Sequence, residues 1–244
     1  MPLFSASGGL VYHLRAWRRA RALWQPFRAE MARWLQQRLP ATGELVLVGP
    51  SAGHCLPLAH LAAFERVTLL EPDPVARFIL RRRLLEQHHH LRVDVEARDF
   101  LLAPLLNGTA GLDALLDERP RATVLFCNVL GQLHFELTEA RHERFGEAFR
   151  ERIVPRLATR AWASFHDRWS LDWKANAGEP PSLRFAARPG DEELGQGLFG
   201  AAGPPVTVLD HGTAELFPAE LPRRYVSWRI TPRALHVVEA LPAP

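Results

Sequence analysis

Five short and largely apolar runs, separated by amphipathic stretches, mark the first two thirds of the chain. They cover residues 45–48, 67–70, 91–97, 122–127 and 160–165. Continuous apolar runs of this length are typical of parallel strands that are buried on both faces of a sheet. The pattern therefore predicts five strands, of which the third, at residues 91–97, is an alternating one with Val93 and Val95 on one side.

The stretches between these runs predict helices. Two helices are predicted at residues 54–64 and 136–153, and a third begins at Pro74, where the preceding Asp73 is a good N-cap. We expect the third helix to bury Val75, Phe78, Ile79 and Leu85. Strands that alternate with helices imply right-handed crossovers and a sheet covered on both faces, which is a Rossmann-like, doubly wound α/β fold.

The N-terminal end of the chain has a different pattern. Between residues 14 and 35, large apolar residues recur at helical spacing and arginines occupy the opposite face. Pro26 divides this stretch as the first residue of a second helix. We expect residues 1–40 to form a helical cap on the Rossmann-like domain of residues 41–244. The arginine face is either solvated or a docking surface for an acidic protein partner.

The C-terminal third interrupts the alternation of strands and helices. Residues 171–205 are rich in glycine and proline, which predicts a loop-rich insertion whose part at 179–205 is a lid over a binding site. Strands are predicted beyond it at residues 206–209, 225–230 and 235–241. The last two form an antiparallel hairpin, because their connection is too short for a parallel crossover.

Composition excludes several classes of protein. The chain has 244 residues, of which 47% are hydrophobic and 23% charged, as in ordinary soluble globular proteins. A formal net charge of +3 is too small to argue for nucleic acid as a partner. No apolar run reaches membrane-spanning length and no signal-peptide pattern is present, so we expect a cytoplasmic protein with no membrane contact. Cys55 and Cys127 lie in apolar segments and predict no disulfide framework.

The turn after the first strand carries the strongest chemical signal. Gly49, Ser51 and Gly53 are small residues that let the backbone approach a nucleotide-like ligand closely. Glu71 follows about 20 residues later, at the end of the second strand, where a carboxylate can accept hydrogen bonds from both ribose hydroxyls. The alternative for Glu71 is a surface acid that caps the next helix.

On these residues the sequence resembles the class I S-adenosylmethionine-dependent methyltransferases, over residues 44–165 and the closing hairpin. The resemblance implies that Gly49, Ser51 and Gly53 surround the methionine part of S-adenosylmethionine and that Glu71 holds its ribose. It also implies the fold, since an antiparallel hairpin completes the sheet in this family. The chain departs from the family at Leu47, where an acid is usual, and at Ser51, which replaces the middle glycine of the loop.

Further cofactor contacts are implied after the third and fourth strands. The resemblance places Asp99 and Phe100 beside adenine, and Asn128 in the segment that lines both cofactor and substrate. Asp99 has the alternative role of a helix or turn cap. Asn128 has that of satisfying backbone groups at a strand end.

The catalytic residues are predicted after the fifth strand. His166, oriented by Asp167, lies near the carboxyl edge of the sheet and has the pKa of a general base for the methyl acceptor. A hydrogen-bonded structural histidine is the alternative. Weaker candidates are Tyr12, His13, His134 and His211. Three tryptophans are candidates for an aromatic acceptor pocket: Trp162, Trp169 and Trp173.

No metal site is expected, because the consecutive His88, His89 and His90 point apart on a helix end. The segment after the fourth strand lacks the Pro-Pro-aromatic pattern of DNA amino-methyltransferases, and Cys127 lacks the preceding proline of cytosine-5 enzymes. A small-molecule or peptide acceptor is therefore expected. Two other functions stay open: a non-catalytic binding or partner protein with this fold, and a nicotinamide-dependent oxidoreductase, which the closing hairpin disfavours.

Overall fold

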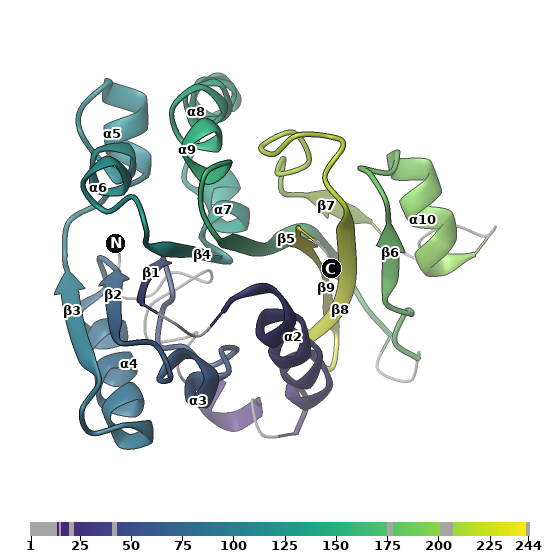
Figure 1. The fold of residues 1–244 in the computed structure, drawn as a ribbon. Helices are drawn as coiled ribbons and strands as arrows, with labels where there is room; N and C mark the ends of the chain where they lie inside the picture. Colours follow the sequence, from purple (N-terminus) through teal and green to yellow (C-terminus); the bar gives the residue numbers. More distant parts are fainter. Residues whose placement is uncertain are drawn as a thin grey trace.

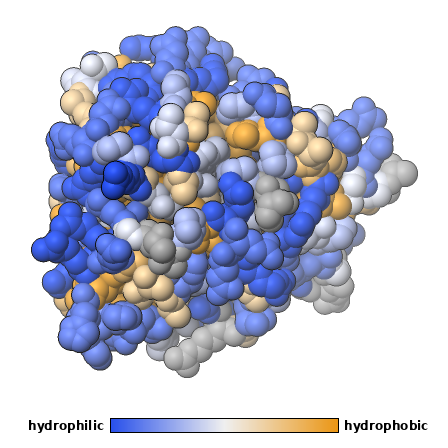
Figure 2. All heavy atoms as spheres, viewed as in Figure 1, coloured by the Kyte–Doolittle hydropathy of each residue, from blue (hydrophilic) through white to orange (hydrophobic). Residues whose placement is uncertain are grey.

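The computed structural model describes residues 14, 16–19, 22–40, 43–174, 178–200 and 207–242, apart from the side chain of His134. In this part of the chain one mixed β-sheet runs through the molecule with helices on both of its faces (Figure 1). The face seen in Figure 2 is mostly hydrophilic, with apolar residues in small scattered groups. No helix among the described residues has the length and apolar character needed to span a bilayer.

The described strands form one sheet in the order β3-β2-β1-β4-β5-β9-β8-β6, and β7 pairs with β5. Strands β1 to β5 are parallel to one another, whereas β6 to β9 pair antiparallel. Their bounds are β1 Glu44–Val48, β2 Arg66–Leu70, β3 Arg92–Glu96, β4 Thr123–Cys127, β5 Trp162–Asp172, β6 Leu183–Phe185, β7 Val208–Asp210, β8 Arg223–Thr231 and β9 Ala234–Leu241. This topology confirms the Rossmann-like fold with an antiparallel C-terminal hairpin that the sequence predicts.

Helices cover both faces of this sheet (Figure 1). They are α2 Gln25–Arg38, α3 Leu58–Leu61, α4 Pro74–Gln87, α5 Leu102–Asn107, α6 Leu112–Glu118, α7 Val129–Gln132, the 3-10 turn η1 Leu133–Phe135, α8 Glu139–Arg152, α9 Val154–Leu157 and α10 Asp191–Phe199. One apolar core lies between the sheet and α2 to α4, and another between the sheet and α5 to α9. Strand β1 contributes to both, because Leu45 and Leu47 face the first core and Val46 and Val48 the second.

Two helix predictions need correction. The segment 54–64 contains only the four-residue helix α3, and the rest of it is turn. Helix α4 begins at Pro74 with Asp73 as its cap, as predicted, but Phe78 is 69% exposed and Ala76, Leu80 and Leu84 are buried instead. The inward face was misjudged because large apolar residues occupy the solvent side of this helix.

Helix α2 joins the N-terminal segment to the closing hairpin. It begins beside Pro26, as predicted, and its Phe27 ring stacks on Trp228 of β8 at a centroid distance of 4.8 Å. The Trp34 indole Nε1 donates a hydrogen bond to the carbonyl oxygen of Pro242. Whether residues 1–40 form a unit of their own stays a prediction.

Strand β5 is longer than the sequence predicts. It continues past Phe165 to Asp172 and pairs with β9 and β7. His166 and Asp167 therefore lie within a strand and not in the loop after it. Consecutive residues of a strand point to opposite faces of the sheet, so these two side chains are separated.

The glycine- and proline-rich region is partly ordered into regular structure. It contains β6, which pairs with β8, and helix α10. Leu194 and Leu198 of α10 pack in a third apolar cluster with Trp173 and Tyr225. The region thus extends the far edge of the sheet.

Candidate functional site

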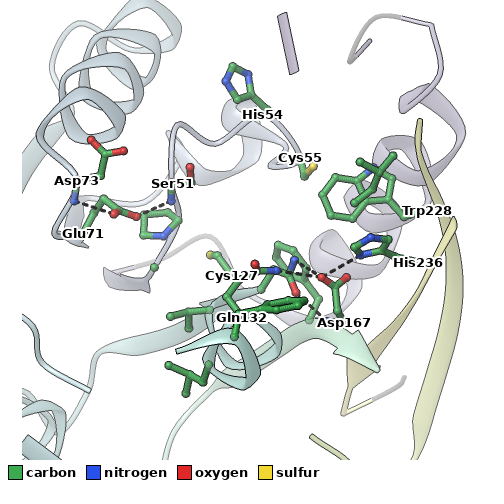
Figure 3. Close-up of a pocket in the computed structure, with 18 of the residues that line it drawn as sticks. Ser51, His54, Cys55, Glu71, Asp73, Cys127, Gln132, Asp167, Trp228 and His236 are labelled. Atoms are coloured by element: carbon green, nitrogen blue, oxygen red, sulfur yellow. Dashed lines mark hydrogen bonds and ion pairs between the residues drawn. The ribbon is translucent and has the colours of Figure 1, made fainter. Parts of the chain in front are cut away.

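A cavity of about 720 Å³ opens where β1, β2 and β4 end, beside the middle of β5 (Figure 3). The chain leaves β1 for β2 on one side and reaches β4 on the other, so the strand order reverses between β1 and β4. Ligands of open α/β sheets bind in the crevice at such a switch point. Within the described residues, the cavity therefore marks the expected binding site.

The turn after β1 forms one wall of the cavity. Gly49 and Gly53 have φ angles of +63° and +65°, which L side chains rarely adopt, and Ser51 is held at +49°. A Cβ at Gly49 would lie 2.5 Å from the Cβ of Val129, so only glycine lets this turn pack against α7. Gly49 and Ser51 line the cavity, whereas Gly53 lies behind it against Leu80.

Glu71 fixes the shape of this turn. Its Oε2 accepts a hydrogen bond from the backbone N–H of Ser51 at 2.7 Å, and its Oε1 accepts from Asp73 N–H at 3.0 Å. Burial raises the pKa of Glu71, and these hydrogen bonds oppose that effect. Each carboxylate oxygen can accept more than one hydrogen bond, so Glu71 keeps acceptor capacity on the cavity side.

Asp99 lines the cavity and also caps a helix. Its Oδ1 accepts from the N–H groups of Leu101 and Leu102, and its Oδ2 from that of Ala103. Phe100 is 3% exposed, packs in the second core and does not line the cavity. Leu101 takes the lining position predicted for Phe100.

Asn128 and Asp167 meet in the floor of the cavity. Asn128 has a φ of +59° at the end of β4, and its side chain both donates to and accepts from Asp167. Gln132 donates a second hydrogen bond to Asp167 Oδ2 at 3.0 Å. Burial acts to raise the pKa of the Asp167 carboxyl, but His236 and the amide donors outweigh it and hold the pKa below its usual range.

His166 is not part of the cavity, which contradicts its predicted position beside the methyl acceptor. Its ring is fully buried on the other face of the sheet, stacked on Phe217 at 5.8 Å and hydrogen-bonded to Ser164. Burial and the nearby Arg223 lower the pKa of His166 to about 3. A histidine in this position is neutral near pH 7 and has no path to a ligand in the cavity.

Two other histidines lie beside Asp167. His236 of β9 lines the cavity with its Nδ1 3.1 Å from Asp167 Oδ2, and the buried His211 follows β7. His211 was only a weak candidate for a catalytic residue in the sequence, and His236 was not predicted at all. Its one signal is a polar residue between Leu235 and Val237 in an otherwise apolar strand, which does not by itself indicate a site.

The lining of the cavity is acidic. Among the described residues it includes two histidines, His54 and His236, but neither arginine nor lysine. Five carboxylates line it: Glu71, Asp73, Asp99, Glu136 and Asp167. A cavity of this kind attracts a cationic ligand and repels a polyanion.

Several weaker predictions fall outside the cavity. Tyr12 and His13 lie outside the described residues, as does the side chain of His134. Trp162, Trp169 and Trp173 do not line the cavity; its two lining tryptophans in the described part of the chain are Trp24 and Trp228. Residues 178–200 do not line it either, so this part of the predicted lid does not cover the site.

No family model and no curated protein matches the chain. It is similar to the solved structure of the glycopeptide N-methyltransferase MtfA complexed with S-adenosyl-L-homocysteine, with 19% identity, a TM-score of 0.34, and coverage of 89% of this chain and 72% of that one. The N-methyltransferase NodS from Bradyrhizobium japonicum, in complex with S-adenosyl-L-homocysteine, is 12% identical with a TM-score of 0.36, and the match covers 94% and 97% of the two chains. An S-adenosylmethionine-dependent methyltransferase from Clostridium acetobutylicum is 9% identical with a TM-score of 0.33, over 88% and 89%. Identities and TM-scores this low assign no function, so function has to be argued from the site.

Proposed function

We propose that this protein is a methyltransferase that binds S-adenosylmethionine at the switch point between β1 and β4. The observation that carries the proposal is the acidic lining, which includes no arginine or lysine among the described residues. S-adenosylmethionine has a positive sulfonium and a positive ammonium group against one carboxylate, so this cavity suits its charge. A nicotinamide dinucleotide has a negative pyrophosphate, which five surrounding carboxylates would repel.

The binding roles follow from the geometry of the turn. Glu71 would accept hydrogen bonds from the ribose hydroxyls while it holds Ser51 in place. Gly49 and Ser51 would contact the methionine part, and Gly53 supports the turn from behind. Asp99 would border adenine together with Leu101, which lines the cavity and donates its N–H to Asp99.

The methyl acceptor would occupy the opposite end of the cavity. Figure 3 shows Asp167, Gln132, Trp228 and His236 grouped there, away from Glu71 and Ser51. Asn128 follows β4, which lies between β1 and β5 in the sheet, and its side chain is bound to Asp167. In the transfer, an acceptor atom would form a bond to the methyl carbon as the carbon–sulfur bond breaks and its electron pair stays on sulfur. A small molecule or a peptide side chain is the proposed acceptor.

Calorimetric titration tests which cofactor the protein binds. We expect S-adenosylhomocysteine and S-adenosylmethionine to bind at one site and NAD to show no binding. Binding of NAD without S-adenosylhomocysteine would overturn the proposal. A screen of hydroxyl and amine compounds for S-adenosylhomocysteine release then separates an enzyme from a non-catalytic binding protein, which would bind the cofactor and yield no methylated product.

A cytoplasmic location and a protein partner on the N-terminal helices complete the proposal. Glu30 of α2 forms an ion pair with Arg224 of β8, and this pair helps to hold the helix against the hairpin. Arg18 and Arg33 are exposed and would form part of the surface on which an acidic partner docks.

A further inference from the structure

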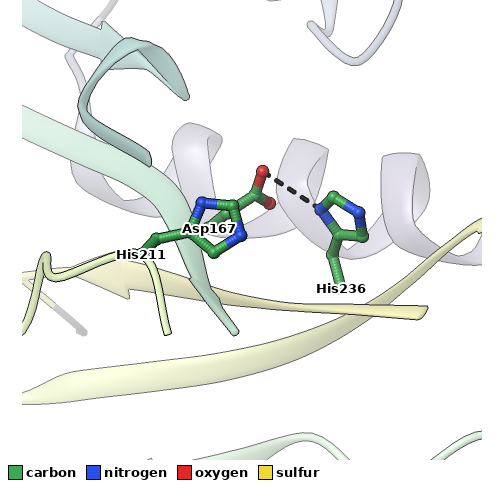
Figure 4. Close-up of side chains that lie close together, drawn as sticks. All are labelled: Asp167, His211 and His236. Carbon is green, nitrogen blue, oxygen red and sulfur yellow. Dashed lines mark ion pairs between the residues drawn. The ribbon is translucent and has the colours of Figure 1, made fainter. Parts of the chain in front are cut away.

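Asp167, His211 and His236 come together from three separate segments (Figure 4). Asp167 and His236 line the proposed acceptor end of the cavity, and His211 is buried next to them. Asp167 belongs to β5, His211 follows β7 and His236 belongs to β9. Each offers one ligand atom, and these atoms all lie within 4.8 Å of one another. Two imidazoles and a carboxylate at this spacing form a donor set for a metal ion.

The ring of His211 is oriented as metal-binding histidines are. Its Nδ1 lies 2.5 Å from the carbonyl oxygen of Gly131, which can only accept, so Nδ1 carries the proton. Nε2 then presents a lone pair, which receives the Ser170 hydroxyl at 2.6 Å. Metal-bound histidines typically donate their other N–H to a carbonyl or carboxylate in this way, which fixes the ring and its tautomer.

One carboxylate oxygen of Asp167 is a buried acceptor that no described residue satisfies. Its Oδ2 accepts from Asn128 and Gln132, whereas its Oδ1 has no hydrogen-bond partner among the described residues. The residue is 0% exposed, and an unsatisfied buried acceptor costs about 1–3 kcal/mol. His236 Nδ1 also lacks a well-aligned hydrogen bond, although it lies 3.1 Å from Oδ2. A cation between these groups would satisfy both.

We propose that Asp167, His211 and His236 bind one divalent transition-metal ion of the Fe²⁺, Co²⁺ or Zn²⁺ class. Imidazole ligands favour these ions over Mg²⁺ and Ca²⁺, which prefer oxygen ligands throughout. Binding would release Ser170 from His211 Nε2. No metal site was expected from the sequence, and these three ligands, which are 44, 25 and 69 positions apart in pairs, form no spaced motif that could have indicated one.

The proposed metal site also indicates a class of methyl acceptor, and this inference rests on the proposed methyl transfer. Three protein ligands would leave coordination positions open to the cavity, which the partly buried His236 lines. An acceptor hydroxyl or phenol bound there would lose its proton to solvent more readily, because the ion stabilises the resulting oxygen anion. That oxygen would form the bond to the methyl carbon while the carbon–sulfur electron pair stays on sulfur.

The test uses the whole chain, stripped with a chelator, in a His88→Ala/His89→Ala/His90→Ala background that removes the adjacent histidines of the surface. Co²⁺ is titrated and followed by visible absorption, and Zn²⁺ by calorimetry. We expect about one equivalent of either ion to bind in this background. No binding there would overturn the proposal, since it would assign any metal uptake to the surface histidines.

Ligand variants place the ion. His236→Gln and His211→Gln should weaken Co²⁺ binding by more than the roughly 10- to 100-fold that the loss of a supporting hydrogen-bond partner costs. His60→Gln, the same change at a histidine outside the cavity, should leave binding unchanged. Undiminished binding in folded His236→Gln, which lies at the cavity surface and tolerates change better than the buried His211, would overturn the inference. S-adenosylhomocysteine titration of the metal-free protein separates this failure from a failure of the proposed function.

Discussion

Asn128 and Asp167 bind each other through two hydrogen bonds that join the end of β4 to the middle of β5. Asn128 Nδ2 donates to Asp167 Oδ2 at 3.0 Å, and Asn128 Oδ1 accepts from the Asp167 N–H at 2.7 Å. Gly131 lets α7 lie directly over this pair, because a Cβ there would come 2.7 Å from the Asp167 nitrogen. The Asp167 carboxylate is thus fixed in direction before any ligand enters the cavity.

Asn128→Asp should destabilise the fold. The variant loses the donor to Asp167 and places a second carboxylate against it, which we expect to lower the free energy of unfolding by roughly 1–3 kcal/mol. Urea denaturation at pH 7 measures the change. Asn128→Gly is the comparison variant: it loses both hydrogen bonds, but it adds no charge and relieves the positive φ, so it should cost less than Asn128→Asp. A larger loss of stability in Asn128→Gly than in Asn128→Asp would contradict the expected repulsion between the two carboxylates.

Glu71→Gln should weaken S-adenosylhomocysteine binding by about 10- to 100-fold, the worth of charge-assisted hydrogen bonds of 1.5–3 kcal/mol. The neutral amide accepts at one atom only, and its NH₂ group faces a backbone N–H. Calorimetric titration gives the affinity. Glu65→Gln makes the same change at an exposed residue before the other end of β2 and should bind as the parent protein does. Equal affinities for the two variants would remove Glu71 from the site.

Strands β1, β2 and β4 were predictable because local apolar runs determine them, whereas the arrangement of polar side chains along β5 was not. His166, Asp167 and Arg168 read as the polar loop after a strand, yet all three are buried inside β5. Their burial is compensated by partners far along the chain: Arg168 pairs with Asp191 and Asp210. No local pattern indicates such partners. The turn at Gly49 and the acid at Glu71 could be predicted to lie together because both belong to one local strand–helix–strand unit.

The buried His166 should make stability depend on pH. Its pKa is lowered from 6.5 to about 3 in the folded protein by burial and by Arg223, with Asp167 opposing and Arg168 adding to the effect. Between those pH values the unfolded chain binds a proton that the folded one does not. The contribution of the neutral His166 ring to the free energy of unfolding is therefore fully present above pH 6.5. It is lost as the pH falls towards 3, by up to about 1.4 kcal/mol per pH unit.

His166→Asn should remove that part of the pH dependence. The amide is uncharged at every pH and can still meet Ser164. Chemical denaturation at several pH values from 7 to 4.5 gives the pH dependence of the free energy of unfolding for both proteins. Over this range the parent protein should lose about 2–3 kcal/mol more of that free energy than the variant does. Affinity for S-adenosylhomocysteine at pH 7 should be unchanged, since His166 lies outside the cavity. Parallel slopes would show that the buried ring does not control acid stability.

Glu239→Gln should be strongly destabilising. Glu239 and Arg223 form a fully buried ion pair, and Tyr225 Oη donates to Glu239 Oε2 at 2.9 Å. Removal of one charge leaves the guanidinium buried without its counter-charge, which typically costs about 3–5 kcal/mol. Thermal and urea unfolding measure the loss. The double variant Arg223→Met/Glu239→Gln should regain part of that stability, and a double variant less stable than Glu239→Gln would contradict this account.

The acidic lining of the cavity also bears on how a catalytic cycle would end. S-adenosylmethionine enters with a positive sulfur, and the transfer leaves a neutral thioether, so the attraction between sulfur and the surrounding carboxylates disappears when the product forms. The spent cofactor would then be held less tightly than the fresh one. If the protein is the proposed methyltransferase, this charge would oppose product inhibition and favour rapid exchange of one cofactor molecule for the next.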